Sequence, residues 1–146
     1  MAENFKFTNQ EDFNFVKITA KELYKEVIKV NCPYFNEDVA FNHKGWGHLM
    51  YKNYNFPRPV ADQYARLKLL RLVPQVVGNS HTLQGIRKTK EFRKIKTDRT
   101  NNKWIKVAKQ VNFYEFIAIL EDVRLKVVVK EDLGKGKYFW SVIPFF

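Results

Sequence analysis

The chain has 146 residues, of which 45% are hydrophobic and 16% aromatic, and its formal net charge is +11. This length fits one domain with its own core, and this apolar content excludes an intrinsically disordered chain. The single cysteine, Cys32, excludes an intramolecular disulfide and a cysteine-rich zinc site. We find no signal-peptide or membrane-spanning pattern, so we expect a cytoplasmic site of action, with delivery by a larger carrier as an alternative.

The positive charge is concentrated in one part of the chain. Residues 1–40 contain five lysines and seven acidic residues, whereas residues 41–146 contain 21 basic and eight acidic residues. The segment from Arg87 to Lys109 is the densest, with ten basic residues against two acidic ones. Clustered positive charge is typical of proteins that bind a polyanion, and RNA is the partner that we expect first.

The N-terminal quarter of the chain predicts one helix. Residues 1–18 show no clear pattern. Thr19 and Glu22 form a capping-box pattern, which predicts a helix that begins there and runs to about residue 30. Pro33 is expected to end it.

Two more helices are expected before the basic segment. Asn42 is a good N-cap for a short helix through Met50. Pro59 suits the start of a longer helix over residues 60–73, in which apolar residues recur at helical spacing. Pro74 should end or kink that helix.

From Thr89 onward the hydrophobic period changes to two, which is the period of β-strands. Helices followed by consecutive strands predict an α+β fold, with N-terminal helices packed on a C-terminal antiparallel β-sheet. We expect a single domain over residues 1–146. The expected strands are Lys103–Val111, Phe113–Leu120, Arg124–Lys130 and Tyr138–Phe145, with a turn at Gly134–Lys137.

The residue types present suit metal-independent RNA cleavage. The sequence lacks the histidine, cysteine and carboxylate spacings of a metal site, and we expect no metal and no cofactor. Cleavage through the RNA 2′-hydroxyl needs a base, an acid for the leaving oxygen, and cations that stabilise the charged phosphorus centre. Histidine, arginine and lysine suit these tasks. The candidates are His43, His48 and His81 for proton transfer, Arg66, Arg71, Arg87 and Lys126 for the phosphate, and Ser141 as a neutral donor.

Several of these residues also have a purely structural interpretation. His48 could be a core histidine, and His43 an exposed residue near a helix start. Arg66 and Arg71 fall outside the apolar stripe of their predicted helix and could be its solvated face. Glu91 is favoured as a counter-charge within the basic segment over a general base. The residues expected to hold RNA are Lys44, Arg87, Arg93, Lys94, Lys96 and Lys126.

Two segments resemble a known family. FNHKGWGHLMYKN and the C-terminal GKGKYFWSVIP, with the PRP loop and leucine-rich helix between them, are similar to phage-type members of the barnase–EndoU–colicin–RelE superfamily of metal-independent ribonucleases. The resemblance covers about residues 39–146, as a nuclease core, and leaves residues 1–38 as a lead-in with one helix. Related sequences commonly have Ser where this chain has Asn42.

The resemblance implies an antiparallel sheet with an RNA cleft on one face. It makes His48 the first choice for general acid or base, with Arg66 or Arg71 at the phosphate and Ser141 donating a hydrogen bond across the cleft. The implied function is an endoribonuclease, a toxin or phage-derived effector, with transfer RNA as a target by analogy alone.

Two alternatives stay open. One is a nucleic-acid-binding module of the same fold that does not cleave, and the other is a phage structural protein that docks an acidic partner. The ribonuclease interpretation predicts a monomer with an acidic immunity or antitoxin protein as inhibitor.

Overall fold

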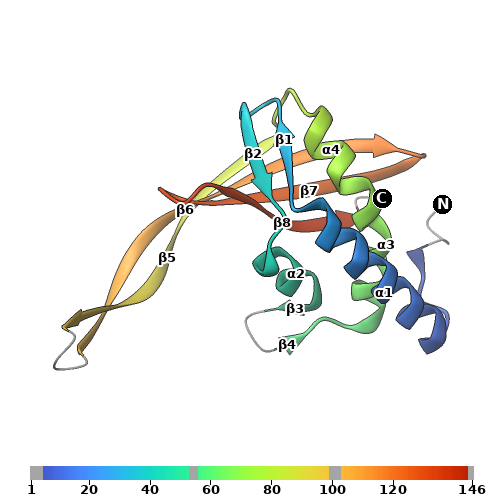
Figure 1. The fold of residues 1–146 in the computed structure, drawn as a ribbon, viewed down its shortest axis with the longest axis horizontal. Coiled ribbons are helices and arrows are strands. Elements are labelled where there is room, and N and C mark those ends of the chain that lie inside the picture. Colours follow the sequence, from blue (N-terminus) through green and yellow to red (C-terminus); the bar gives the residue numbers. More distant parts are fainter. Residues whose placement is uncertain (1–4, 53–55, 99–102, 145–146) are drawn as a thin grey trace.

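The computed structural model describes residues 5–52, 56–98 and 103–144, and it confirms the predicted α+β fold (Figure 1). Four α-helices lie within residues 10–79, and most of the main sheet is formed by residues 85–144. The elements are α1 (Gln10–Val27), β1 (Lys29–Cys32), β2 (Glu37–Ala40), α2 (His43–Met50), β3 (Tyr51–Lys52), β4 (Phe56–Pro57), α3 (Val60–Leu69), the short 3-10 helix η2 (Leu70–Leu72), α4 (Val73–Asn79), β5 (Gly85–Asp98), β6 (Lys103–Leu120), β7 (Val123–Asp132) and β8 (Lys137–Pro144).

The main sheet has six strands in the order β1-β2-β8-β7-β6-β5. Strands β5 to β8 form an antiparallel meander, as the consecutive strand patterns predict. The chain's early hairpin, β1–β2, adds to the far edge through a parallel pairing of β2 with β8. One face of the sheet carries the main core beneath the helices, and Phe116, Val127 and Phe139 are among its most buried side chains.

Helix α1 begins nine residues earlier than the capping-box pattern predicted. Asn9 is the N-cap, and its side-chain oxygen accepts a hydrogen bond from the Asp12 backbone N–H at 2.8 Å. The buried stripe of α1 runs from Phe13 to Tyr24, on both sides of Thr19. Tertiary burial of this stripe therefore favours one long helix, and Thr19 lies exposed in its middle.

The predicted end of this helix was also wrong, because the chain forms a strand where the helix was expected to continue. Helix α1 stops at Val27, and Ile28 follows with a φ of 60°, which turns the chain. Residues Lys29–Cys32 then pair with β2 as strand β1. A four-residue edge strand gives too short a pattern to be recognised in the sequence.

The long helix predicted over residues 60–73 is interrupted near its C-terminal end, a few residues before Pro74. Helix α3 stops at Leu69, and the 3-10 helix η2 precedes α4. Pro74 occupies the first turn of α4, where its missing N–H costs no helical hydrogen bond. Helix α3 therefore ends before Pro74, as predicted, but the helical path continues to Asn79.

Strand β6 joins two predicted strands into one, and its first half leaves the main sheet. Strand β6 pairs with β7 only over residues 111–120, whereas its pairing with β5 extends to Lys103. Residues 90–98 of β5 and 103–110 of β6 thus form a two-stranded ribbon, here called the arm. Figure 1 shows the arm projecting from the body of the molecule.

Candidate nucleic-acid interface

Helices α2 and α3 cover the edge of β8 that β2 leaves open. Strand β2 pairs only with Lys137 and Tyr138, at the start of β8. Gly45 of α2 lies so close to β8 that an added Cβ would overlap the backbone carbonyl oxygen of Phe139. We call this contact region the α2–β8 crossing, and the absence of a side chain at Gly45 is what lets α2 approach the strand.

The start of α2 is fixed as the sequence predicted. The Asn42 side-chain oxygen accepts hydrogen bonds from the backbone N–H groups of Lys44 and Gly45, at 3.1 and 3.4 Å. The hydroxyl of Tyr24 donates to the Asn42 carbonyl at 2.5 Å, which ties α2 to α1. Trp46 packs against the Tyr24 ring, with 5.6 Å between the ring centroids, so Trp46 anchors the helix.

The crossing places the His48 imidazole on the last strand. The ring stacks on Trp140 with a centroid distance of 4.0 Å and an interplanar angle of 24°. Arg58, from the PRP loop, donates to the His48 carbonyl at 2.9 Å, and its Nη2 lies 3.4 and 3.3 Å from the ring Nδ1 and Nε2. Trp140 and Arg58 therefore hold the His48 side chain in place. His48 is half-buried, so part of the residue still reaches solvent.

This environment keeps the imidazole neutral. The pKa of His48 is lowered to about 4, chiefly by burial and also by the nearby charges of Arg58, Arg66 and Lys130, although a backbone hydrogen bond at Trp140 raises it. Protonation would place another positive charge among three cations in a partly desolvated site. At neutral pH the ring is therefore a proton acceptor.

A groove opens beside His48, with a cavity volume of about 920 Å³. Helix α2 contributes Lys44 and His48, and β8 contributes Trp140. Glu91 and Lys94 of β5 and Lys130 of β7 complete the charged lining. We call this cavity the groove; three lysines and one partly exposed tryptophan give it the character of a site for an anionic, aromatic ligand.

Lys130 connects the groove to the rest of the sheet face. Its ammonium lies 4.2 Å from the Trp140 ring centroid and 5.5 Å from that of Phe113, and it pairs with the Glu91 carboxylate at 3.0 Å. The guanidinium of Arg87 also lies over the Phe113 ring, 4.3 Å from its centroid. Cations and aromatic rings thus alternate across four strands, which stabilises their mutual positions.

Arg66 and Ser141 are hydrogen-bonded to each other and buried, and neither lines the groove. Arg66 Nη1 donates to Ser141 Oγ at 2.6 Å and to the Val142 carbonyl at 3.2 Å, while its Nε donates to Asp62 at 2.8 Å. The expectation that Arg66 lies outside the apolar stripe is wrong, because these polar partners let a guanidinium face the core. Arg66 thus satisfies one backbone carbonyl of β8, that of Val142.

Three candidate residues lie away from the groove. Arg71 is exposed in η2 and pairs with Glu121 at 2.7 Å. His43 is the exposed first residue of α2, and His81 is exposed between α4 and β5. None of the three lines the groove, so His48 is the histidine that the fold places there.

The expected RNA-binding residues divide in the same way. Lys44 and Lys94 line the groove, and Lys44 also pairs with Asp132 at 3.8 Å. Lys126 of β7 pairs with Glu115 of β6 at 3.5 Å and does not line the groove. The backbones of Arg93 and Lys96 belong to β5, but their side chains lie outside the described part of the structure.

Sequence reasoning missed two residues that hold the site together. Arg58 was read as part of a loop, although it fixes His48 through three contacts. Lys130 is absent from the candidates predicted from the sequence, whereas its side chain lines the groove and is only 6% exposed. Their basic charge was visible in the sequence, but their pairing with His48 and Trp140 depends on elements far apart in the chain.

Comparison with known proteins adds no relatives. No family model, no curated protein and no solved structure matches the chain. Among the described residues, no group of three or more histidine, cysteine or acidic side chains is arranged to hold a metal ion. In the same residues, no helix has the length and apolar character needed to cross a membrane.

Proposed function

We propose that the groove binds RNA and that the protein is a metal-independent endoribonuclease with His48 as its general base. One observation carries the proposal: a neutral, solvent-reachable imidazole lies in a groove lined by Lys44, Lys94 and Lys130. The clustered positive charge of the chain supports a polyanionic substrate, and the resemblance in FNHKGWGH supports this choice of histidine.

In the proposed step, a ring nitrogen of His48 accepts the proton of the RNA 2′-hydroxyl. The 2′-oxygen attacks phosphorus, the bond to the 5′-oxygen breaks, and the products are a 2′,3′-cyclic phosphate and a 5′-hydroxyl. The ammonium groups of the groove offset the charge that builds on the phosphate oxygens. The leaving oxygen needs a proton, and Lys130 and Tyr51 are donors in the groove lining.

Arg58, Arg66 and Ser141 act as positioning residues in this proposal. Arg58 orients the imidazole and keeps it unprotonated, which preserves the basic form of the ring. Arg66 and Ser141 hold β8, and with it Trp140, in place against α3. An acidic inhibitor protein would cover the same groove, since its lining carries more positive than negative charge.

A second function, RNA binding without cleavage, is favoured by one specific contact. Arg58 Nη2 lies within 3.4 Å of both ring nitrogens of His48, so the base is partly occupied by a donor. A low pKa also makes the imidazole a weaker base. In this alternative, His48 and Trp140 form a stacking platform for bases, and the lysines hold the phosphates.

Incubation with total RNA in EDTA separates these functions. We expect the wild-type protein to leave cyclic-phosphate ends, and we expect His48→Gln to lower the cleavage rate by about 100-fold or more while RNA affinity stays within about twofold. His43→Gln is the matched control, because it changes an exposed histidine of the same helix. Unchanged cleavage by His48→Gln contradicts the role of His48. Salt-dependent binding without cleavage by the wild type supports the binding module.

A further inference from the structure

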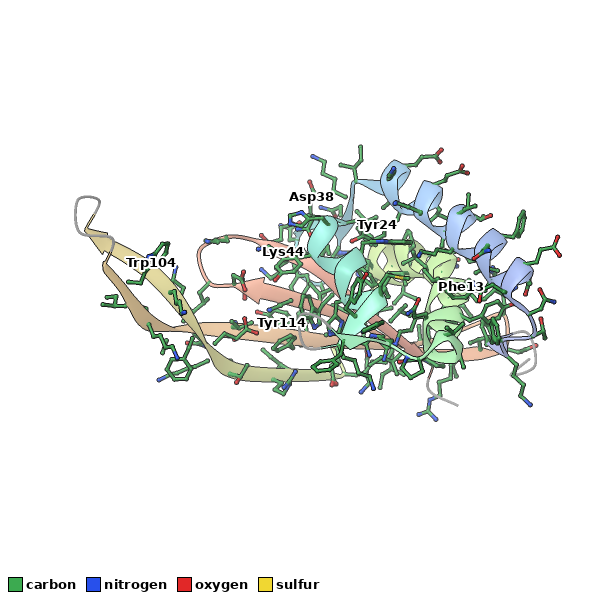
Figure 2. The ribbon with its side chains drawn as sticks, turned by 90° about the horizontal axis from the view of Figure 1, so that it is seen from below. Phe13, Tyr24, Asp38, Lys44, Trp104 and Tyr114 are labelled. Atoms are coloured by element: carbon green, nitrogen blue, oxygen red, sulfur yellow. The ribbon has the colours of Figure 1, made fainter. Side chains whose placement is uncertain are left out.

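The arm carries exposed aromatic side chains that have no role in the proposed cleavage step. Phe92 and Trp104 are 73% and 59% exposed, which is unusual for large aromatic side chains. Figure 2 shows Trp104 on the arm, well separated from Phe13 and Tyr24 in the body. Large exposed rings on a projecting ribbon indicate an interaction surface.

The pairing register places these rings on one face of the arm. Phe92 lies opposite Ala108, Lys94 opposite Lys106, and Trp104 opposite residue 96. Directly opposed residues of an antiparallel pair share a face, and every second residue along a strand returns to it. The two aromatic residues are therefore separated along this face by the Lys94–Lys106 pair, over about 13 Å.

The same face is continuous with the groove. Phe92 and Lys94 line the groove as well as the base of the arm. The arm strands, residues 90–98 and 103–110, contain seven basic and two acidic residues. A ligand that leaves the groove along the arm therefore meets positive charge and exposed rings in succession.

The geometry points to single-stranded RNA as the occupant of this face: we infer that the arm extends the RNA path from the groove, with Trp104 stacking on a base beyond the cleavage position. Aromatic rings stack on unpaired bases, while the flanking lysines bind the phosphates of the same strand. A duplex hides its base faces, and an apolar partner would not need Lys94 and Lys106 between the rings. The inference rests on the proposed function for the choice of RNA as the polyanion.

Two oligoribonucleotides test the inference, one of roughly 16 nucleotides and one of roughly 4 nucleotides, the limits of common single-strand site sizes. Both carry 2′-O-methyl groups, so they lack the nucleophile and cannot be cleaved. We expect Trp104→Ser and Lys106→Glu each to weaken binding of the longer strand by about tenfold. Binding of the shorter strand, which fits within the groove, should change by less than about twofold.

Ile105→Ser is the matched control, because Ile105 is 50% exposed on the opposite face of the arm. Equal losses in Ile105→Ser and Trp104→Ser, or no loss in either, overturn the inference. So does an equal loss for a duplex of the same length, which would show that the arm binds phosphates without stacking. A dimer that Trp104→Ser converts to a monomer in light scattering would assign the arm to a second copy of the chain. If the wild type binds neither strand, the proposed function itself fails.

Discussion

The α2–β8 crossing and the arm are both built from basic and aromatic residues, but they use them in opposite ways. At the crossing, Arg66 and Ser141 are buried and bonded to each other, and His48 is stacked on Trp140. On the arm, Phe92 and Trp104 face solvent. Strand β8 has helices along its open edge, whereas no third strand among the described residues pairs with the arm.

Neighbouring elements, more than composition, therefore decide whether a cation stabilises the fold or faces a ligand. A cation enclosed by several elements exchanges water for fixed partners, and its removal costs stability. A cation on a two-stranded ribbon keeps its water and remains available to a polyanion. We therefore expect substitutions at the crossing to change stability first, and substitutions on the arm to change binding alone.

Arg66 gives the largest expected effect. Arg66→Ala removes the donors to Ser141, Val142 and Asp62, and we expect the free energy of unfolding to fall by about 3 kcal/mol or more. Arg71→Ala, which breaks only an exposed pair, should change it by less than about 0.5 kcal/mol. Urea unfolding of both variants measures the contrast. Equal values would show that burial of Arg66 does not contribute to stability.

The two glycines of α2 allow a tightly packed position and an open position to be compared within one helix. Gly45→Ala places a methyl group against the Phe139 carbonyl, so we expect a loss of about 1–3 kcal/mol in the free energy of unfolding. Gly47→Ala meets no atom within 4 Å and should stabilise the helix by about 0.5–1 kcal/mol.

Thermal unfolding of the two glycine variants tests this prediction, because Gly45→Ala should lower the melting temperature and Gly47→Ala should raise it. Both variants add the same methyl group to the same helix, so the helix propensity gained is similar. A stabilised Gly45→Ala variant would contradict the close contact of α2 with β8.

The pH dependence that His48 contributes should be smaller than the effect of Arg66→Ala. Its pKa is about 4 in the folded protein and 6.5 in the unfolded chain, so the unfolded state binds the proton first as the pH falls. Stability should therefore decrease between pH 6.5 and pH 4 by about 1–2 kcal/mol, after allowance for the partly exposed ring, and no further below pH 4.

Unfolding of wild type and His48→Gln at a series of pH values isolates this contribution, because other titrating groups are common to both. The difference between the two proteins should be constant above pH 6.5 and should change below it. If His48 is the general base, cleavage should persist at pH 5, where an ordinary histidine is protonated. A flat difference across this range would show that His48 titrates normally.

Much of the architecture was accessible from the sequence because it depends on local patterns. Asn42 has the side chain of an N-cap, and this prediction is confirmed. Residues Arg124–Lys130 form a strand as predicted, but residues 127–130 are all buried, so the strand is not half-buried throughout. The boundaries of α1 were wrong, since the stripe from Phe13 to Tyr24 is recognised as one helix only when its buried partners are known.

The α+β class, the excess of positive charge and the position of His48 in a capped, glycine-containing helix all follow from local sequence patterns. Only the tertiary structure decided that Arg66 is buried while Arg71 is exposed, and that Arg58 and Lys130 approach His48. The physical reason is that charge and helical period are local properties, whereas burial and pKa depend on elements that the fold brings together from distant parts of the chain.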